Sequence, residues 1–132
     1  MSRFSLPMRV YYEDTDAGGI VYYGAYLRFL ERARTEWLRT LGLDHRALGV
    51  DHGVMFTVSR LEIEYLRPAR LDDAIRVTVA LERAGRASLK LAQCVHRDSV
   101  ELCRARVRIA CVDAATCKPR PLPGVVTSEL DP

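Results

Sequence analysis

Several features of membrane, secreted and nucleic-acid-binding proteins are missing from this sequence of 132 residues. It has no run of about 18 apolar residues, the length that a membrane-spanning helix needs, so we expect no transmembrane segment. Its N-terminus reaches Pro7 and then charged residues before any apolar stretch of signal-peptide length, which favours a cytoplasmic protein. Because the arginines are dispersed and form no basic block, we also expect no nucleic-acid partner.

Some residue types are scarce. Asparagine is absent, Gln93 is the only glutamine, and Lys90 and Lys118 are the only lysines among 20 basic residues. We interpret this bias as that of a GC-rich genome rather than as selection for guanidinium chemistry. The net charge of +3 is a weak argument for an anionic ligand. With 48% hydrophobic residues the chain is not disordered, and its length suits one domain, residues 1–132, around a single core.

The cysteines lack the spacing of a metal site or of a disulfide framework. They form no C-x-x-C pair and are not at zinc-finger spacing from the three histidines. Disulfides are rare in the cytoplasm. We therefore expect no metal and interpret the cysteines as reduced, small, buried hydrophobic residues. The four are Cys94, Cys103, Cys111 and Cys117.

One stretch, from about Tyr23 to Leu41, has the periodicity of an amphipathic helix. Apolar residues recur there at spacings of three and four, which places them on one face. Gly42 follows at the position where a glycine often ends a helix. The residues of the apolar stripe are Tyr23, Tyr26, Leu27, Leu30, Ala33, Trp37, Leu38 and Leu41.

The remainder of the chain is mostly extended. Alternating apolar residues and tight turns predict an antiparallel meander, with a short connection at Asp44–Leu48 that has some helical character. The proline-rich tail KPRPLPG cannot continue a sheet. We therefore predict an α+β fold in which one long central helix packs on a curved antiparallel sheet of about five strands. The expected strands are Met8–Tyr12, Val54–Leu66, Ala74–Leu81, Ser88–His96 and Glu101–Val112.

The segment YYEDTDAGGIVYYGAYLRFLERAR, residues 11–34, combines residue types that carry chemistry. Asp14 and Asp16 share one face of an extended chain, and Gly18 and Gly19 let a ligand approach the backbone closely. The predicted helix begins next, and the free N–H groups at a helix start suit a developing oxyanion. A carboxylate beside such amides is a minimal site for acyl transfer.

Other interpretations of this segment remain open at the level of spacing. Short D-x-D-x-G-G stretches are mostly ordinary turns in which aspartate accepts backbone hydrogen bonds. The pattern also resembles the start of an EF-hand loop, but the glutamate at the twelfth position is missing, which argues against calcium.

Residues 9–39, RVYYEDTDAGGIVYYGAYLRFLERARTEWLR, closely resemble the signature of hotdog-fold acyl-CoA thioesterases. The similarity is greatest to the Tol–Pal-associated (YbgC) group of the 4-hydroxybenzoyl-CoA thioesterase family, and LEIEYLRPARLDD, GRASL and CVDAATCKPRPLP extend it over nearly the whole chain. The resemblance implies a helix wrapped by an antiparallel sheet, assembly into homodimers or homotetramers, and hydrolysis of an acyl-CoA to the free acid and coenzyme A. It implies no cofactor, because coenzyme A is part of the substrate, and it leaves acyl carrier protein open as a further partner.

The resemblance also implies roles for single residues. The family's catalytic carboxylate, a nucleophile or a general base, falls on Asp16, and Asp14 supports the turn. The backbone N–H that polarises the thioester carbonyl in the benzoyl-type relatives falls on Tyr23. Many members of the YbgC group have histidine there, so a mechanism that needs imidazole would be compromised in this chain.

The remaining candidate residues would bind substrate. Arg86 and Ser88, on the turn between Arg83 and Lys90, resemble the family's nucleotide-binding region, and a solvated arginine is the alternative interpretation for Arg86. Gly19 is a further candidate for contact with the substrate, and the candidates that line the acyl pocket are Tyr22, Tyr23, Tyr26 and Phe56.

Two other functions compete with thioester hydrolysis. A hotdog dehydratase usually pairs a histidine with an acid, and no histidine lies near Asp16 in the sequence. A non-catalytic protein that binds acyl carrier protein or envelope machinery is the second, and the intact DTDAGG turn argues against lost catalysis.

Overall fold

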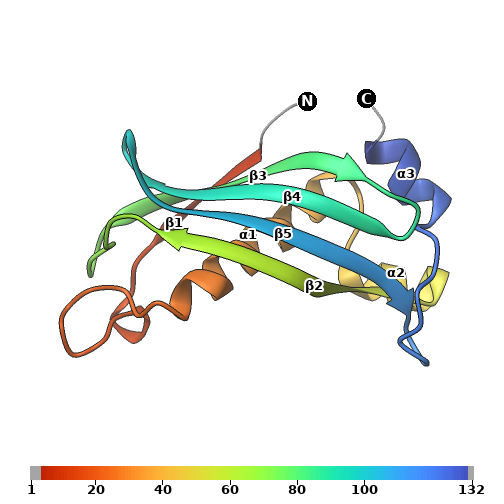
Figure 1. Ribbon diagram of the computed structural model, residues 1–132, viewed down its shortest axis with the longest axis horizontal. Helices are drawn as coiled ribbons and strands as arrows, with labels where there is room; N and C mark the ends of the chain where they lie inside the picture. Colours follow the sequence, from red (N-terminus) through yellow and green to blue (C-terminus); the bar gives the residue numbers. More distant parts are fainter. Residues whose placement is uncertain (1–3, 131–132) are drawn as a thin grey trace.

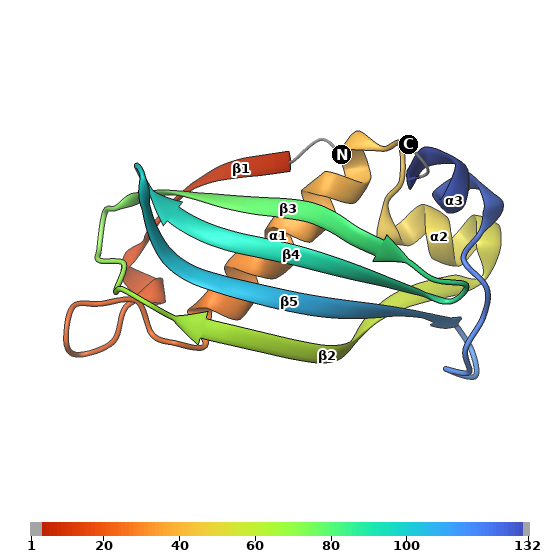
Figure 2. The ribbon, with the colours of Figure 1, turned by 45° about the horizontal axis from the view of Figure 1, so that its top comes forward.

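In the computed structural model, which describes residues 4–130, five strands form one antiparallel sheet in the order β1-β3-β4-β5-β2. Helix α1 (Ala25–Thr40) lies across one face of this curved sheet, while α2 (His45–His52) and α3 (Gly124–Leu130) lie at one end of it (Figures 1 and 2). The predicted α+β arrangement is therefore confirmed. No helix within residues 4–130 is long and apolar enough to cross a membrane. The strands are β1 Phe4–Arg9, β2 Val54–Tyr65, β3 Ala74–Ala84, β4 Ser88–Arg97 and β5 Val100–Asp113.

Helix α1 forms where the apolar stripe predicted it, but it is shorter at both ends. It begins at Ala25 rather than Tyr23, and Gly42, with φ 81°, follows the last turn as expected. Leu27 is 42% exposed although it was assigned to the stripe, because the sheet covers the side of the helix centred on Ala33. The buried residues of α1 are Ala25, Tyr26, Phe29, Leu30, Ala33, Trp37 and Leu38.

The prediction of a simple meander is wrong for β2. Strands β3, β4 and β5 are joined by successive turns as predicted, but β2 pairs with β5, from Val54↔Asp113 to Tyr65↔Cys103. The segment between β2 and β3 therefore carries the chain from one edge of the sheet towards the other, where β1 pairs with β3. Alternation determines which face a strand buries, but it leaves the choice of partner open.

The first strand and the C-terminus also differ from expectation. The first strand forms, but the bounds Met8–Tyr12 are wrong, because β1 spans Phe4–Arg9 and the chain makes a 3-10 turn at Tyr12–Asp14. Hydrogen bonding within that turn, where the Asp14 amide donates to the Tyr11 carbonyl at 3.0 Å, replaces pairing with a neighbouring strand. Helix α3 was not predicted, since seven residues give too short a periodic pattern.

The four cysteines differ in burial. Cys103 and Cys111 are buried as expected, and burial raises the pKa of the Cys103 thiol to about 12. Cys94 is half-buried, and Cys117 is exposed at φ 61°, so the interpretation as buried residues is wrong for Cys117. Its place on a loop after β5 keeps it out of the core.

A single buried amide joins α1 to the sheet. Gln93 on β4 is fully buried, and its Nε2 donates to the carbonyl oxygens of Leu30 at 3.1 Å and Thr78 at 3.4 Å. Its Oε1 accepts a hydrogen bond of 3.0 Å from Arg34 of α1. Both ends of the amide are thus satisfied, as a buried polar group requires.

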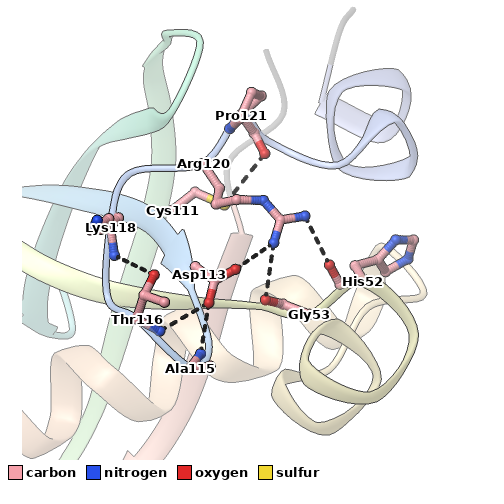
Figure 3. A network of polar contacts seen from close by, with 9 residues as sticks. All are labelled: His52, Gly53, Cys111, Asp113, Ala115, Thr116, Lys118, Arg120 and Pro121. Carbon is pink, nitrogen blue, oxygen red and sulfur yellow. Dashed lines mark hydrogen bonds and ion pairs between the residues drawn. The ribbon is translucent and has the colours of Figure 1, made fainter.

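The segment after β5 is fixed by a polar network around Asp113 (Figure 3). The Asp113 carboxylate accepts hydrogen bonds of 2.9 Å from the amides of Ala115 and Thr116 and one of 2.8 Å from Arg120. Arg120 also donates to the carbonyl oxygen of His52 at 3.4 Å, which connects this segment to the end of α2. The amides of Thr116 and Ala115, and then Arg120, lower the pKa of Asp113 to about 2.

This depressed pKa predicts a pH dependence of stability. An ordinary aspartate has a pKa of 3.8, so the unfolded chain takes up the proton at a higher pH than folded Asp113 does. The stabilisation is fully present above pH 3.8 and is lost as the pH falls through about 2. As the pH falls through this window, we expect the free energy of unfolding to decrease less for Asp113→Asn than for the wild type. Urea unfolding at several pH values measures this difference. A slope for Asp113→Asn equal to that of the wild type would contradict the prediction.

Candidate active site

The loop between β1 and α1 folds back on itself as a short hairpin. Thr15 and Val21 form an antiparallel bridge, and the amide of Asp16 donates to the carbonyl oxygen of Ile20 at 2.9 Å. The Val21 amide donates to the carbonyl oxygen of Ala69 at 2.9 Å, which attaches the hairpin to the segment before β3. The segment that carries Asp16 is therefore held beside the segment that leads into α1.

Asp14 fixes this loop to the helix from a buried position. It is 3% exposed, its Oδ2 accepts from the Tyr11 amide at 2.9 Å, and its Oδ1 accepts from the Arg28 guanidinium at 3.0 Å. Its carbonyl oxygen accepts from the Tyr22 amide at 2.9 Å. With both carboxylate oxygens engaged, Asp14 supports the turn and is not positioned to react with a ligand.

Asp16 differs from Asp14 in exposure and in hydrogen bonding. Its side chain is exposed and its Oδ1 accepts from the Gly18 amide at 2.8 Å, while Oδ2 has no partner among residues 4–130. A Cβ on Gly18 would lie 3.2 Å from Oδ1, and Gly19 has φ +79°, so both positions favour glycine. One oxygen of Asp16 therefore holds the turn, as the structural interpretation expected, and the other is open to a ligand.

Tyr23 lies just before α1 rather than within it. Gly24 is the N-cap and offers no side-chain cap. In the described part of the chain, the backbone N–H groups of Tyr23 and Gly24 donate to no other group. A Cβ on Gly24 would lie 2.7 Å from the Tyr22 ring, so this glycine gives the ring its space. The amide of Tyr23 is thus a free donor at the start of the helix, although the helix begins two residues later than predicted.

A group of tyrosines surrounds this helix start. The rings of Tyr22 and Tyr23 are 4.6 Å apart, and Tyr65 of β2 donates from its hydroxyl to the carbonyl oxygen of Tyr23 at 3.1 Å. A hydrogen bond with Tyr23 raises the pKa of Tyr22. Tyr26, predicted as a substrate contact, is buried, and its hydroxyl accepts from the Ala69 amide at 3.1 Å. Tyr22, at 46% exposure, and Tyr23, at 64%, are accessible in this chain, whereas Tyr26 forms part of the core.

Phe56 lies in a different place from the tyrosines. It lines a cavity of about 380 Å³ between α1 and strands β2, β4 and β5. The other apolar walls of this cavity include Trp37, Leu89 and Ile109, and Glu31 is one of its polar residues. Phe56 was predicted to contact the substrate together with Tyr22 and Tyr26, but the structure places it away from the hairpin that carries Asp16.

The turn between β3 and β4 carries a basic pocket of about 230 Å³. Ser88 lines it as predicted, but the cations that line it are Arg83, Lys90 and Arg108, whereas Arg86 is exposed outside it. Within the described residues none of these three cations forms an ion pair. Lys90 is the cross-strand neighbour of both Arg83 on β3 and Arg108 on β5. The grouping depends on which strands pair, so it could not be predicted from each strand alone.

Known proteins resemble this chain over most of its length. The model of the thioesterase-like superfamily matches residues 10–130. Acyl-CoA thioesterase YbgC of Haemophilus influenzae is 44% identical over 120 residues, which cover 91% of this chain and 88% of that protein. Acyl-CoA thioester hydrolase YbgC of Escherichia coli is 42% identical over 128 residues, 96% of this chain and 95% of that protein. The crystal structure of a probable thioesterase from Bartonella henselae has a TM-score of 0.87 and 34% identity, over 92% of this chain and 100% of that one.

The family match includes the Asp16 hairpin, helix α1 and all strands except β1. On these grounds the chain belongs to the thioesterase-like superfamily, has the hotdog fold that the sequence resemblance implied, and is a thioester hydrolase.

Proposed function

We propose that this protein hydrolyses acyl-CoA thioesters, with Asp16 as the catalytic carboxylate and the Tyr23 backbone N–H as the donor to the thioester carbonyl. The open Oδ2 of Asp16 is the observation that carries the proposal, since its neighbour Asp14 has both oxygens engaged. The free Tyr23 amide supports it, because such a donor stabilises the oxyanion that forms in acyl transfer.

Two routes fit this arrangement. As a nucleophile, Asp16 attacks the carbonyl carbon and displaces coenzyme A as its thiolate, which takes a proton, and water then hydrolyses the mixed anhydride. As a general base, Asp16 removes a proton from the water that attacks the same carbon. In both routes the products are the free acid and coenzyme A, and no histidine is needed.

We propose that the basic pocket of Arg83, Lys90 and Arg108, with Ser88, binds the phosphates of coenzyme A. The three cations have no carboxylate partner among residues 4–130, so their charge is available to an anion. Arg86 remains a candidate at the rim of this turn, where its carbonyl oxygen accepts from the Leu122 amide and its side chain is exposed.

We further propose that two copies of the chain complete one site. The Asp16 hairpin and the turn between β3 and β4, which carries the basic pocket, lie at opposite ends of the sheet (Figures 1 and 2). Helix α1, with 16 residues, is about 24 Å long. In a two-fold dimer, the basic pocket of one copy would lie beside the Asp16 hairpin of the other. The edge strand β2, with exposed Met55, Val58 and Tyr65, offers a surface for this pairing.

Replacement of Asp16 tests the catalytic assignment. We expect Asp16→Asn to lower kcat by about 10²- to 10⁴-fold, the usual contribution of a positioned acid or base, with coenzyme A binding retained. Steady-state hydrolysis over short, long and aromatic acyl-CoAs measures the effect. Asp51→Asn, an exposed aspartate on α2, is the matched control and should keep wild-type kcat. Near-normal turnover by Asp16→Asn on an accepted substrate would exclude Asp16 as the catalytic group.

Removal of two cations tests the coenzyme site. We expect Lys90→Ala/Arg108→Ala to raise KM for an acyl-CoA by about 10-fold, since hydrogen bonds to charged groups are lost, and to change kcat little. For a substrate with the same acyl group on pantetheine, which has no phosphate, the variant and the wild type should have the same KM. Arg32→Ala, an exposed arginine on α1, serves as the control. An equal rise of KM for both substrates would argue against phosphate binding in this pocket.

Mixing of the Asp16→Asn and Lys90→Ala/Arg108→Ala variants tests the shared site. Co-expression of Asp16→Asn with Lys90→Ala/Arg108→Ala should give dimers with one intact site, formed by Asp16 of one copy and the basic pocket of the other. Activity at low acyl-CoA concentration should then exceed the mean of the two separate variants. Activity equal to that mean would place both parts of the site on one chain.

A further inference from the structure

A group of three side chains on the outer face of the sheet, the face turned away from α1, contains the donor atoms of a metal site. Cys94 and His96 are two residues apart on β4 and therefore point to the same face, and Glu101 on β5 is the register partner of His96. One donor atom from each residue lies within 4.8 Å of the other two, and Cys94 Sγ is 3.1 Å from Glu101 Oε2. All three residues are half-buried.

The surrounding structure holds two of these residues in place. The Cys94 amide donates to the Thr78 hydroxyl at 3.0 Å, which anchors the β4 backbone to β3. Arg104 donates to Glu101 Oε1 at 2.5 Å and leaves Oε2 directed to Cys94. The ladder shifts register between Val95 and His96. This irregularity places Glu101 opposite His96 and near Cys94.

The chemistry of the three donors favours one class of ion. A thiolate, an imidazole and a carboxylate together match Zn²⁺, which binds sulfur at about 2.3 Å and nitrogen or oxygen at about 2.0–2.2 Å, whereas Ca²⁺ and Mg²⁺ require oxygen donors. The charges of one thiolate and one carboxylate neutralise a divalent cation. We propose that Cys94, His96 and Glu101 bind one Zn²⁺ ion, with the fourth position left to water. This site is separate from the Asp16 hairpin and from the basic pocket, and it does not rest on the proposed function.

Charges near the group set the conditions for binding. The Arg104 guanidinium opposes a cation, but its hydrogen bond orients the carboxylate, as partners of metal ligands commonly do. The thiol must lose its proton when the ion binds, so the affinity falls as the pH is lowered.

Titration of the metal-free, full-length protein with Zn²⁺ tests this site. We expect one ion per chain, measured by competition with a chromophoric chelator, and a rise in Tm with Zn²⁺ concentration because the ion binds the folded state. Co²⁺ in place of Zn²⁺ should give a thiolate-to-cobalt charge-transfer band. Cys94→Ser, His96→Ala and Glu101→Gln should each weaken Zn²⁺ binding at least about 10-fold, the loss that even an outer partner of a metal site produces.

The exposed Cys117 and His52 provide matched controls elsewhere on the surface. Cys117→Ser and His52→Ala should retain wild-type stoichiometry, affinity and the cobalt band. Thermal unfolding without metal should show that each variant is folded, so that a loss of binding reports on the ligand itself. Absence of stoichiometric Zn²⁺ binding, or binding that survives Cys94→Ser and disappears in Cys117→Ser, would overturn the proposal.

Discussion

The geometry of the candidate active site depends on one buried carboxylate, that of Asp14. It accepts the Tyr11 amide and the Arg28 guanidinium, and its own carbonyl oxygen accepts the Tyr22 amide. These bonds connect the end of β1, the hairpin and helix α1 at a single residue. Because the Arg28 side chain is 48% exposed, solvent screens the charge attraction, and the geometry rests mainly on hydrogen bonds that orient the loop.

The sequence DTD thus contains two aspartates with different roles, and their surroundings distinguish them. Asp14 is held in the protein interior and satisfied, whereas Asp16 uses one oxygen for the turn and presents the other to solvent. The glycines that follow Asp16 are part of the same arrangement, since a side chain on Gly18 would press on the Asp16 carboxylate. The turn interpretation and the catalytic interpretation of this motif are therefore compatible, because the turn positions the group proposed to react.

Local patterns predicted much of this fold, and long-range contacts account for what they missed. The spacing of apolar residues in α1 and the alternation in β3, β4 and β5 report on the same burial that stabilises these elements, so they could be read from sequence. The pairing of β2 with β5 and the basic pocket both depend on strand order, which no single segment encodes. The Cys94, His96 and Glu101 group was missed for the same reason, because Glu101 joins Cys94 and His96 only through the pairing of β5 with β4.

Strand order also bears on how the chain folds during synthesis. Helix α1 and β2 leave the ribosome early, but the strand that pairs with β2 is β5, the last of the sheet. The apolar face of α1 therefore stays partly uncovered until nearly the whole chain has emerged, and such surfaces are prone to aggregate. Long sequence separation between partners also slows folding. We expect this small protein to fold in a late, concerted step rather than element by element from its N-terminus.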